Sequence, residues 1–186
     1  MAEKNGDNLF LEDNEDNIDN TYLVFGIEKE NYAVNIAHVT EIVGIQRISE
    51  VPDVPHFIKG VTNLRGQVIP VMDMRLRFNL PWRDYDDRTT IIVLELDSVS
   101  TGLIVDRVHE VVDIQPQQID PPPSWHKNDN QGVISGLGKT DDNVSIILDV
   151  PHLLYDKDMH VDLAKAATHG QAESEPVGPG QGREGY

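Results

Sequence analysis

The sequence predicts an all-β fold, either a barrel or a sandwich, built from about nine or ten short strands. Three observations carry this prediction. Apolar runs of four to eight residues, rich in Val and Ile, recur at short intervals between residues 21 and 156. Each run is followed by Gly, Pro, Asn or Asp, which favour turns. The intervals lack the helices that parallel crossover connections require.

The runs themselves give the predicted strands, and two-residue or three-residue turns separate several of them. Tight turns are predicted at Arg65-Gly66, at Asp97-Ser98 and over 141–143. In chain order the predicted strands are Tyr22–Ile27, Tyr32–Ile36, Gly60–Leu64, Val68–Met72, Thr89–Leu96, Leu103–Val105, Val108–Ile114, Val133–Leu137 and Val144–Leu148.

Two short helices are predicted between these strands. Asn35 is a suitable N-cap for a helix over 36–43, where four apolar residues fall on one stripe, and Gly44 suits the left-handed position that ends a helix. Glu41 then lies on the polar face of that helix. A second helix begins at Pro151, because proline is tolerated at the first helical position.

The ordered body is predicted to cover 21–156, with a tail at each end. Residues 1–20 carry seven acids and one lysine, and this composition predicts disorder. Residues 157–186 contain the end of the last helix and then a tail rich in Ala, Gly, Pro and Gln. Prolines predict an extended connector between Ile114 and Gly132. Two sheet units are expected, at roughly 21–80 and 89–149.

Composition excludes several classes of protein. The chain has 186 residues, no cysteine, and a net charge of −17, from 32 acidic and 15 basic side chains. Such a charge opposes binding to nucleic acid or to an anionic membrane, and the lack of cysteine excludes disulfides and thiolate metal sites. Residues 59–88 form the one locally basic stretch, with six bases and four acids. A cytoplasmic protein is expected.

No reaction centre emerges from the sequence, so a binding module is the favoured class and no cofactor or metal is expected. The seven histidines form no paired metal-ligand spacing, and adjacent His109 and Glu110 point to opposite faces of a strand. Ser135 lacks the spacing of a nucleophile elbow. The glycines at 180–185 match a dinucleotide fingerprint but follow no strand and open no helix.

A specific resemblance lies between Phe57 and Asp73. The string FIKGVTNLRGQVIPVMD resembles the signature of the chemotaxis coupling family, the CheW-like adaptors. The resemblance extends through the opening strands from Tyr22, through Gly102–Val112, and through Ile134–Gly138 to Ile146–Asp149. It therefore covers about 21–156 without a break.

The resemblance implies a non-enzymatic scaffold that folds as two linked five-stranded SH3-like β-barrels with short helices. Members of the family bridge the cytoplasmic tips of chemoreceptors and the regulatory domain of the histidine kinase CheA. Such an adaptor is cytoplasmic and is recruited to membrane-associated receptor arrays without entering the membrane. A CheW-like adaptor of a related pathway, such as twitching motility, is the alternative. The resemblance also implies apolar patches for the kinase at the barrel ends.

The same resemblance implies a receptor-binding set. The spacing of the residues by itself favours the simpler interpretation, in which Arg65 only keeps an exposed hairpin soluble. The position of Arg65 in the family's N-L-R-G string favours a receptor-facing role instead, with Glu41 as its charge partner. Val39 is expected either to contact the receptor or to join the core. Lys59 and Gly60 are expected near the same surface, with Gly60 also suited to a close backbone approach. Separately, Asp73 is expected to pair with Arg75 and Arg77.

Overall fold

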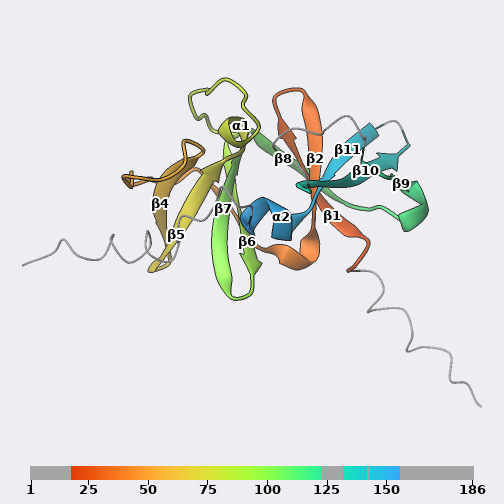
Figure 1. Cartoon of the computed structure of the whole chain (residues 1–186), viewed down its shortest axis with the longest axis horizontal. Helices are drawn as coiled ribbons and strands as arrows, with labels where there is room; N and C mark the ends of the chain where they lie inside the picture. Colours follow the sequence, from red (N-terminus) through yellow and green to blue (C-terminus); the bar gives the residue numbers. More distant parts are fainter. Residues whose placement is uncertain (1–17, 123–131, 142, 156–186) are drawn as a thin grey trace, which may run out of the picture.

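The computed structural model describes residues 18–122, 132–141 and 143–155. The two predicted tails, apart from residues 18–20, and residues 123–131 of the proline-rich connector lie outside these ranges. The described part of that connector is not extended throughout, since it contains a 3-10 turn at Pro116–Gln118. In the described residues the fold is mostly β, with two sheets and only short helices (Figure 1). The predicted class, an all-β fold with two sheet units and short helices, is confirmed. Among the described strands no continuous ladder closes either sheet into a barrel.

The first sheet has six strands in the order β8-β1-β2-β11-β10-β9. All neighbours are antiparallel except β2 and β11, which run parallel. The strands are β1 (Thr21–Ile27), β2 (Glu30–Asn35), β8 (Arg107–Asp113), β9 (Ile119–Asp120), β10 (Ile134–Thr140) and β11 (Asn143–Leu148).

The second sheet has five strands in the order β3-β6-β7-β5-β4, with β5 and β7 parallel. Its strands are β3 (Val39–Gly44), β4 (Ile58–Leu64), β5 (Gln67–Asp73), β6 (Thr90–Leu96) and β7 (Val99–Val105). The short helices are α1 (Met74–Arg77), α2 (Val150–Tyr155) and the 3-10 turns η1 (Ile36–His38) and η2 (Pro116–Gln118).

The expected units at 21–80 and 89–149 do not describe these sheets, because each sheet takes strands from both ranges. The chain forms β1 and β2 of the six-stranded sheet, then all five strands of the other sheet from β3 to β7, and returns to the first sheet at β8. The parallel pair β2–β11 joins the two parts of the six-stranded sheet, as a crossover connection allows.

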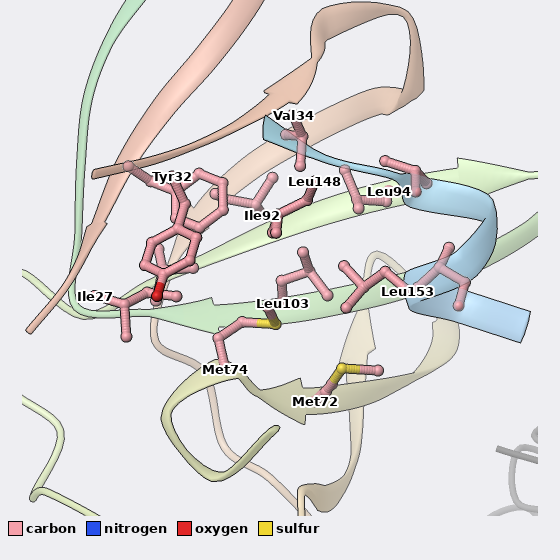
Figure 2. Close-up of a cluster of buried hydrophobic side chains, with 14 of the residues drawn as sticks. Ile27, Tyr32, Val34, Met72, Met74, Ile92, Leu94, Leu103, Leu148 and Leu153 are labelled. Atoms are coloured by element: carbon pink, nitrogen blue, oxygen red, sulfur yellow. The ribbon is translucent and has the colours of Figure 1, made fainter. Parts of the chain in front are cut away.

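The main core lies between the two sheets, where α2 also packs (Figures 1 and 2). Along β6, Ile92 and Leu94 face this core, while Ile91 and Val93 face a second cluster on the far side of the five-stranded sheet. A third cluster covers the other face of the six-stranded sheet. Because central strands are buried on both faces, they form continuous apolar runs in the sequence, and this is why those strands were predictable.

The helix predicted over 36–43 is wrong. Asn35 does cap a helical turn, accepting a hydrogen bond from Ala37 N–H at 2.8 Å, but the turn is a 3-10 helix that ends at His38. From Val39 the chain is strand β3, paired with β6. A ladder with a buried neighbour offers more backbone hydrogen bonds and packing than one isolated helical turn, so tertiary pairing overrides the local pattern.

Candidate functional site

Arg65 lies at the tip of the hairpin between β4 and β5. Leu64 and Gln67 form the last pair of that ladder, and Arg65 and Gly66 alone make the turn. Their φ angles are 54° and 85°, both left-handed, as a type I′ turn requires. The predicted tight turn is confirmed, and it projects the Arg65 side chain into solvent.

Glu41 lies on β3 and not on a helix. A bulge separates Val39, which pairs with Leu94, from Glu41, which pairs with Val93. Residues i and i+2 of a regular strand share a face, but the extra residue in a bulge reverses the alternation. Val39 therefore faces the main core, where it is half-buried, and Glu41 faces the side of the second cluster.

The side chains of Glu41 and Arg65 form an ion pair, with Arg65 Nη2 2.8 Å from Glu41 Oε1. The predicted partnership of these two residues is confirmed. The Arg65 side chain is 84% exposed and that of Glu41 25% exposed. Because an exposed pair contributes only about 0.2–1 kcal/mol to stability, its main effect is to hold a guanidinium and a carboxylate together at the surface.

The pair spans the two edge strands of the five-stranded sheet, since β3 begins the strand order and β4 ends it. The segment after β3 completes this approach. Ser49 and Val61 exchange two backbone hydrogen bonds, at 2.8 and 2.9 Å, and Thr62 Oγ1 donates to Arg47 C=O at 2.8 Å. The sheet thus curls so that the segment after β3 lies against β4, while the ion pair joins β3 to the tip of the β4–β5 hairpin.

Gly60 makes this curl possible, and its predicted role in close backbone approach is confirmed. Its φ is +139°, and a Cβ at this position would lie 2.0 Å from the carbonyl oxygen of Ser49. Gly60 is buried, so it shapes the surface without presenting a side chain.

Lys59 stands apart from Arg65. Six residues of extended chain separate them along β4, roughly 20 Å at about 3.3 Å per residue. Its Nζ lies 5.7 Å from the ring centroid of Trp82, whose side chain is half-exposed. Trp82 packs edge-on against Tyr85. The expectation that Lys59 shares a surface with Arg65 does not match this arrangement.

The predicted pairing of Asp73 with Arg75 and Arg77 is wrong. Asp73 instead caps α1, accepting hydrogen bonds from the N–H groups of residues 75 and 76 at 2.9 and 3.2 Å, and accepts the Tyr85 hydroxyl at 2.7 Å. Burial raises the pKa of Tyr85, and the hydrogen bond to the Asp73 carboxylate raises it further.

The two arginines have other partners. Arg77 stacks over the Phe57 ring. Arg75 pairs with Asp106, which lies 31 residues away.

Ile42 is an exposed apolar residue beside Glu41 that sequence reasoning misplaced. It was assigned to the buried stripe of the predicted helix, but its side chain is 44% exposed on β3. The sequence of 39–44, VTEIVG, does not alternate apolar and polar residues, so it carries no local strand signal that would have placed Ile42 on the surface.

The described residues hold no group of three or more His, Asp or Glu side chains arranged to bind a metal ion. Within the same residues, no helix is long and apolar enough to span a bilayer.

Comparison with known proteins gives a consistent result. A family model described as a CheW-like domain matches residues 21–158. The chemotaxis protein CheW of Klebsiella aerogenes is 34% identical over 138 residues, which are 74% of this chain and 83% of that protein. The chemotaxis protein CheW of Helicobacter pylori is 34% identical over 143 residues, covering 77% and 85% of the two chains.

A solved structure is also similar. The crystal structure of the scaffolding protein TtCheW from Thermoanaerobacter tengcongensis superposes with a TM-score of 0.68 at 37% identity. The match covers 75% of this chain and 94% of that one. The similarity therefore extends through both sheets, including the hairpin that carries Arg65 and the strand that carries Glu41.

Proposed function

The chain belongs to the CheW-like domain family, and from this premise we propose that it couples chemoreceptors to the histidine kinase CheA in chemotaxis signalling. It is a scaffolding member of a non-enzymatic family. The observation that carries the proposal is the unbroken match across both sheets, because a scaffold needs the relative placement of two binding surfaces more than any single residue. The protein works in the cytoplasm and joins membrane-associated receptor arrays through its partners.

The receptor-facing surface in this proposal is centred on the Glu41–Arg65 ion pair. A planar guanidinium recognises carboxylates and amide carbonyls on a helical receptor tip. The exposed Ile42 follows Glu41 on β3 and faces the other side of the strand, so it lies outside this surface. Gly60 supports the surface from beneath by admitting the Ser49 segment. Val39 contributes from the core side of β3, and Lys59 extends the contact only if the receptor reaches the far end of β4.

The kinase-facing surface in this proposal is apolar. Transient scaffold interfaces have a desolvated centre surrounded by a polar rim. Among the described residues, Val111 and Val144 are exposed on the six-stranded sheet, and Val99 is exposed on the five-stranded one. These side chains are the sites at which the regulatory domain of CheA makes its apolar contacts.

Co-sedimentation tests the coupling directly. Receptor-containing membranes, CheA and this protein are mixed in all combinations, and the pellets are analysed. We expect CheA to pellet in larger amounts when this protein is present. CheA that pellets equally well without it would contradict the proposal.

Two charge variants test the receptor surface in the same assay. Arg65→His and Glu41→Lys are expected to reduce pelleting of this protein, with circular dichroism as the control for an intact fold. The charge-swapped double variant Glu41→Arg, Arg65→Glu is expected to recover part of the loss. Wild-type pelleting by both single variants would show that the receptor binds elsewhere.

A further inference from the structure

The turn that carries Arg65 is held from within by a neighbouring side chain. Asn63 Oδ1 accepts a hydrogen bond from the N–H of Gly66 at 2.8 Å, reaching across Leu64 and Arg65. We infer that Asn63 is a positioning residue: it fixes the left-handed turn that directs the Arg65 guanidinium to Glu41. This inference rests on the proposed function, in which the Glu41–Arg65 ion pair binds the receptor.

Arg65 needs such support because its backbone conformation is unfavourable. A side chain with a Cβ disfavours φ near +55°, and type I′ turns prefer Asn, Asp or Gly at that position. Gly66 has open space where a Cβ would be, so its glycine serves the left-handed φ of +85° and not a close contact. A glycine with open surroundings has several accessible conformations. A hydrogen bond to its N–H selects one of them.

The direction of the Arg65 side chain depends on the turn because little else holds it. Its side chain is 84% exposed, and among the described residues the ion pair to Glu41 is the polar contact that holds it. Glu41, by contrast, is fixed by the ladder between β3 and β6. Release of the Gly66 N–H would therefore move the arginine partner and leave the glutamate in place.

Nuclear magnetic resonance tests this without a receptor. The readout is the order parameter of the Arg65 Nε–H bond, with Glu41→Gln as the reference for a broken ion pair. Asn63→Leu, which removes the acceptor, is expected to lower the order parameter to the Glu41→Gln level. Asn63→Asp, which keeps a carboxylate oxygen for the Gly66 N–H, is expected to preserve it. Gln67→Ala, an exposed change on the other side of the same turn, is the matched control.

Two results would overturn the inference in this experiment. One is an unchanged order parameter in Asn63→Leu. The other is an equal loss in Asn63→Leu and Gln67→Ala, which would mean that any change at the turn disturbs Arg65. The Gly66 amide exchange rate shows whether the hydrogen bond was removed in each variant.

A receptor-binding arm separates positioning from direct contact. Asn63→Leu is expected to weaken binding to receptor tips roughly two- to tenfold, the range for loss of one hydrogen bond. In an Arg65→Gln background the same substitution is expected to have no further effect, since Asn63 acts through Arg65. Losses that multiply would show that Asn63 touches the receptor itself and would overturn the inference. If Arg65→Gln alone leaves binding unchanged, the proposed receptor surface fails, and the order parameter alone decides the role of Asn63.

Discussion

Arg75 and Asp106 form a two-pronged ion pair: Arg75 Nε lies 2.8 Å from Asp106 Oδ1, and Nη2 lies 2.7 Å from Oδ2. Their side chains are 13% and 8% exposed. Asp106 also accepts the N–H of Glu28 at 2.7 Å. Since Arg75 belongs to α1, Asp106 joins β7 to β8, and Glu28 lies between β1 and β2, this carboxylate ties the two sheets together.

We expect Asp106→Asn to destabilise the protein by about 3 kcal/mol, because it leaves a mostly buried guanidinium without its counter-charge. The free energy of unfolding from urea denaturation at pH 7 measures this. Asp113→Asn, at an exposed position, is the control and should cost less than about 1 kcal/mol. Equal effects of the two substitutions would contradict the structural role of the Arg75–Asp106 pair.

The contribution of Asp106 should depend on pH. Burial disfavours its charged form, but the hydrogen bonds from Arg75 and from the Glu28 N–H outweigh this and lower the pKa of Asp106. A carboxyl whose pKa is lower in the folded state adds stability above its unfolded pKa of about 3.9 and loses it as the pH falls through the folded pKa. The stability difference between wild type and Asp106→Asn is therefore expected to shrink below pH 4. Unfolding curves from pH 7 to pH 2.5 test this, and a constant difference would contradict it.

Gly60→Ala should be far more damaging than Gly44→Ala. At Gly60 a Cβ would meet the Ser49 carbonyl oxygen at 2.0 Å in a left-handed backbone, whereas at Gly44 nothing lies within 4 Å. We expect a loss of about 3 kcal/mol or more for the former, by overpacking and backbone strain together. The latter should change stability by less than about 1 kcal/mol. Thermal unfolding of both variants gives the comparison, and similar melting temperatures would show that the close approach of Ser49 is unimportant.

Arg65→Gln should separate stability from binding. Because the ion pair with Glu41 is exposed, its removal is expected to change the free energy of unfolding by less than about 1 kcal/mol. Receptor co-sedimentation by the same variant is expected to fall several-fold. A variant that loses stability and binding in parallel would mean that Arg65 serves the fold and not the receptor.

Part of the fold was predictable because the signals are local. Strands such as β6, with buried side chains on both faces, appear in the sequence as runs of Ile, Val and Leu. The turns at Arg65-Gly66 and Asp97-Ser98 depend on residues that tolerate positive φ or lie beside glycine. Arg65 and Glu41 were identified through a family resemblance in short strings of sequence.

Other features depended on which segments meet in space. β3 carries apolar residues at a spacing that suits a helix, and only its ladder with β6 makes it a strand. The bulge in that ladder puts Val39 and Glu41 on opposite faces. Asp106 is 31 residues from Arg75, so nothing local distinguished it from Asp73 as the partner.

The amino-acid sequence was enough to predict the strand-rich class and most of the turns, which follow from the backbone preferences of adjacent residues. It also identified Arg65 and Glu41, but only through the family resemblance of the strings that contain them. The tertiary structure decided the strand order, the edges that Glu41 and Arg65 connect, and the partner of each buried charge. These depend on long-range pairing, in which many segments of similar hydrophobicity compete and only packing of the whole chain selects among them.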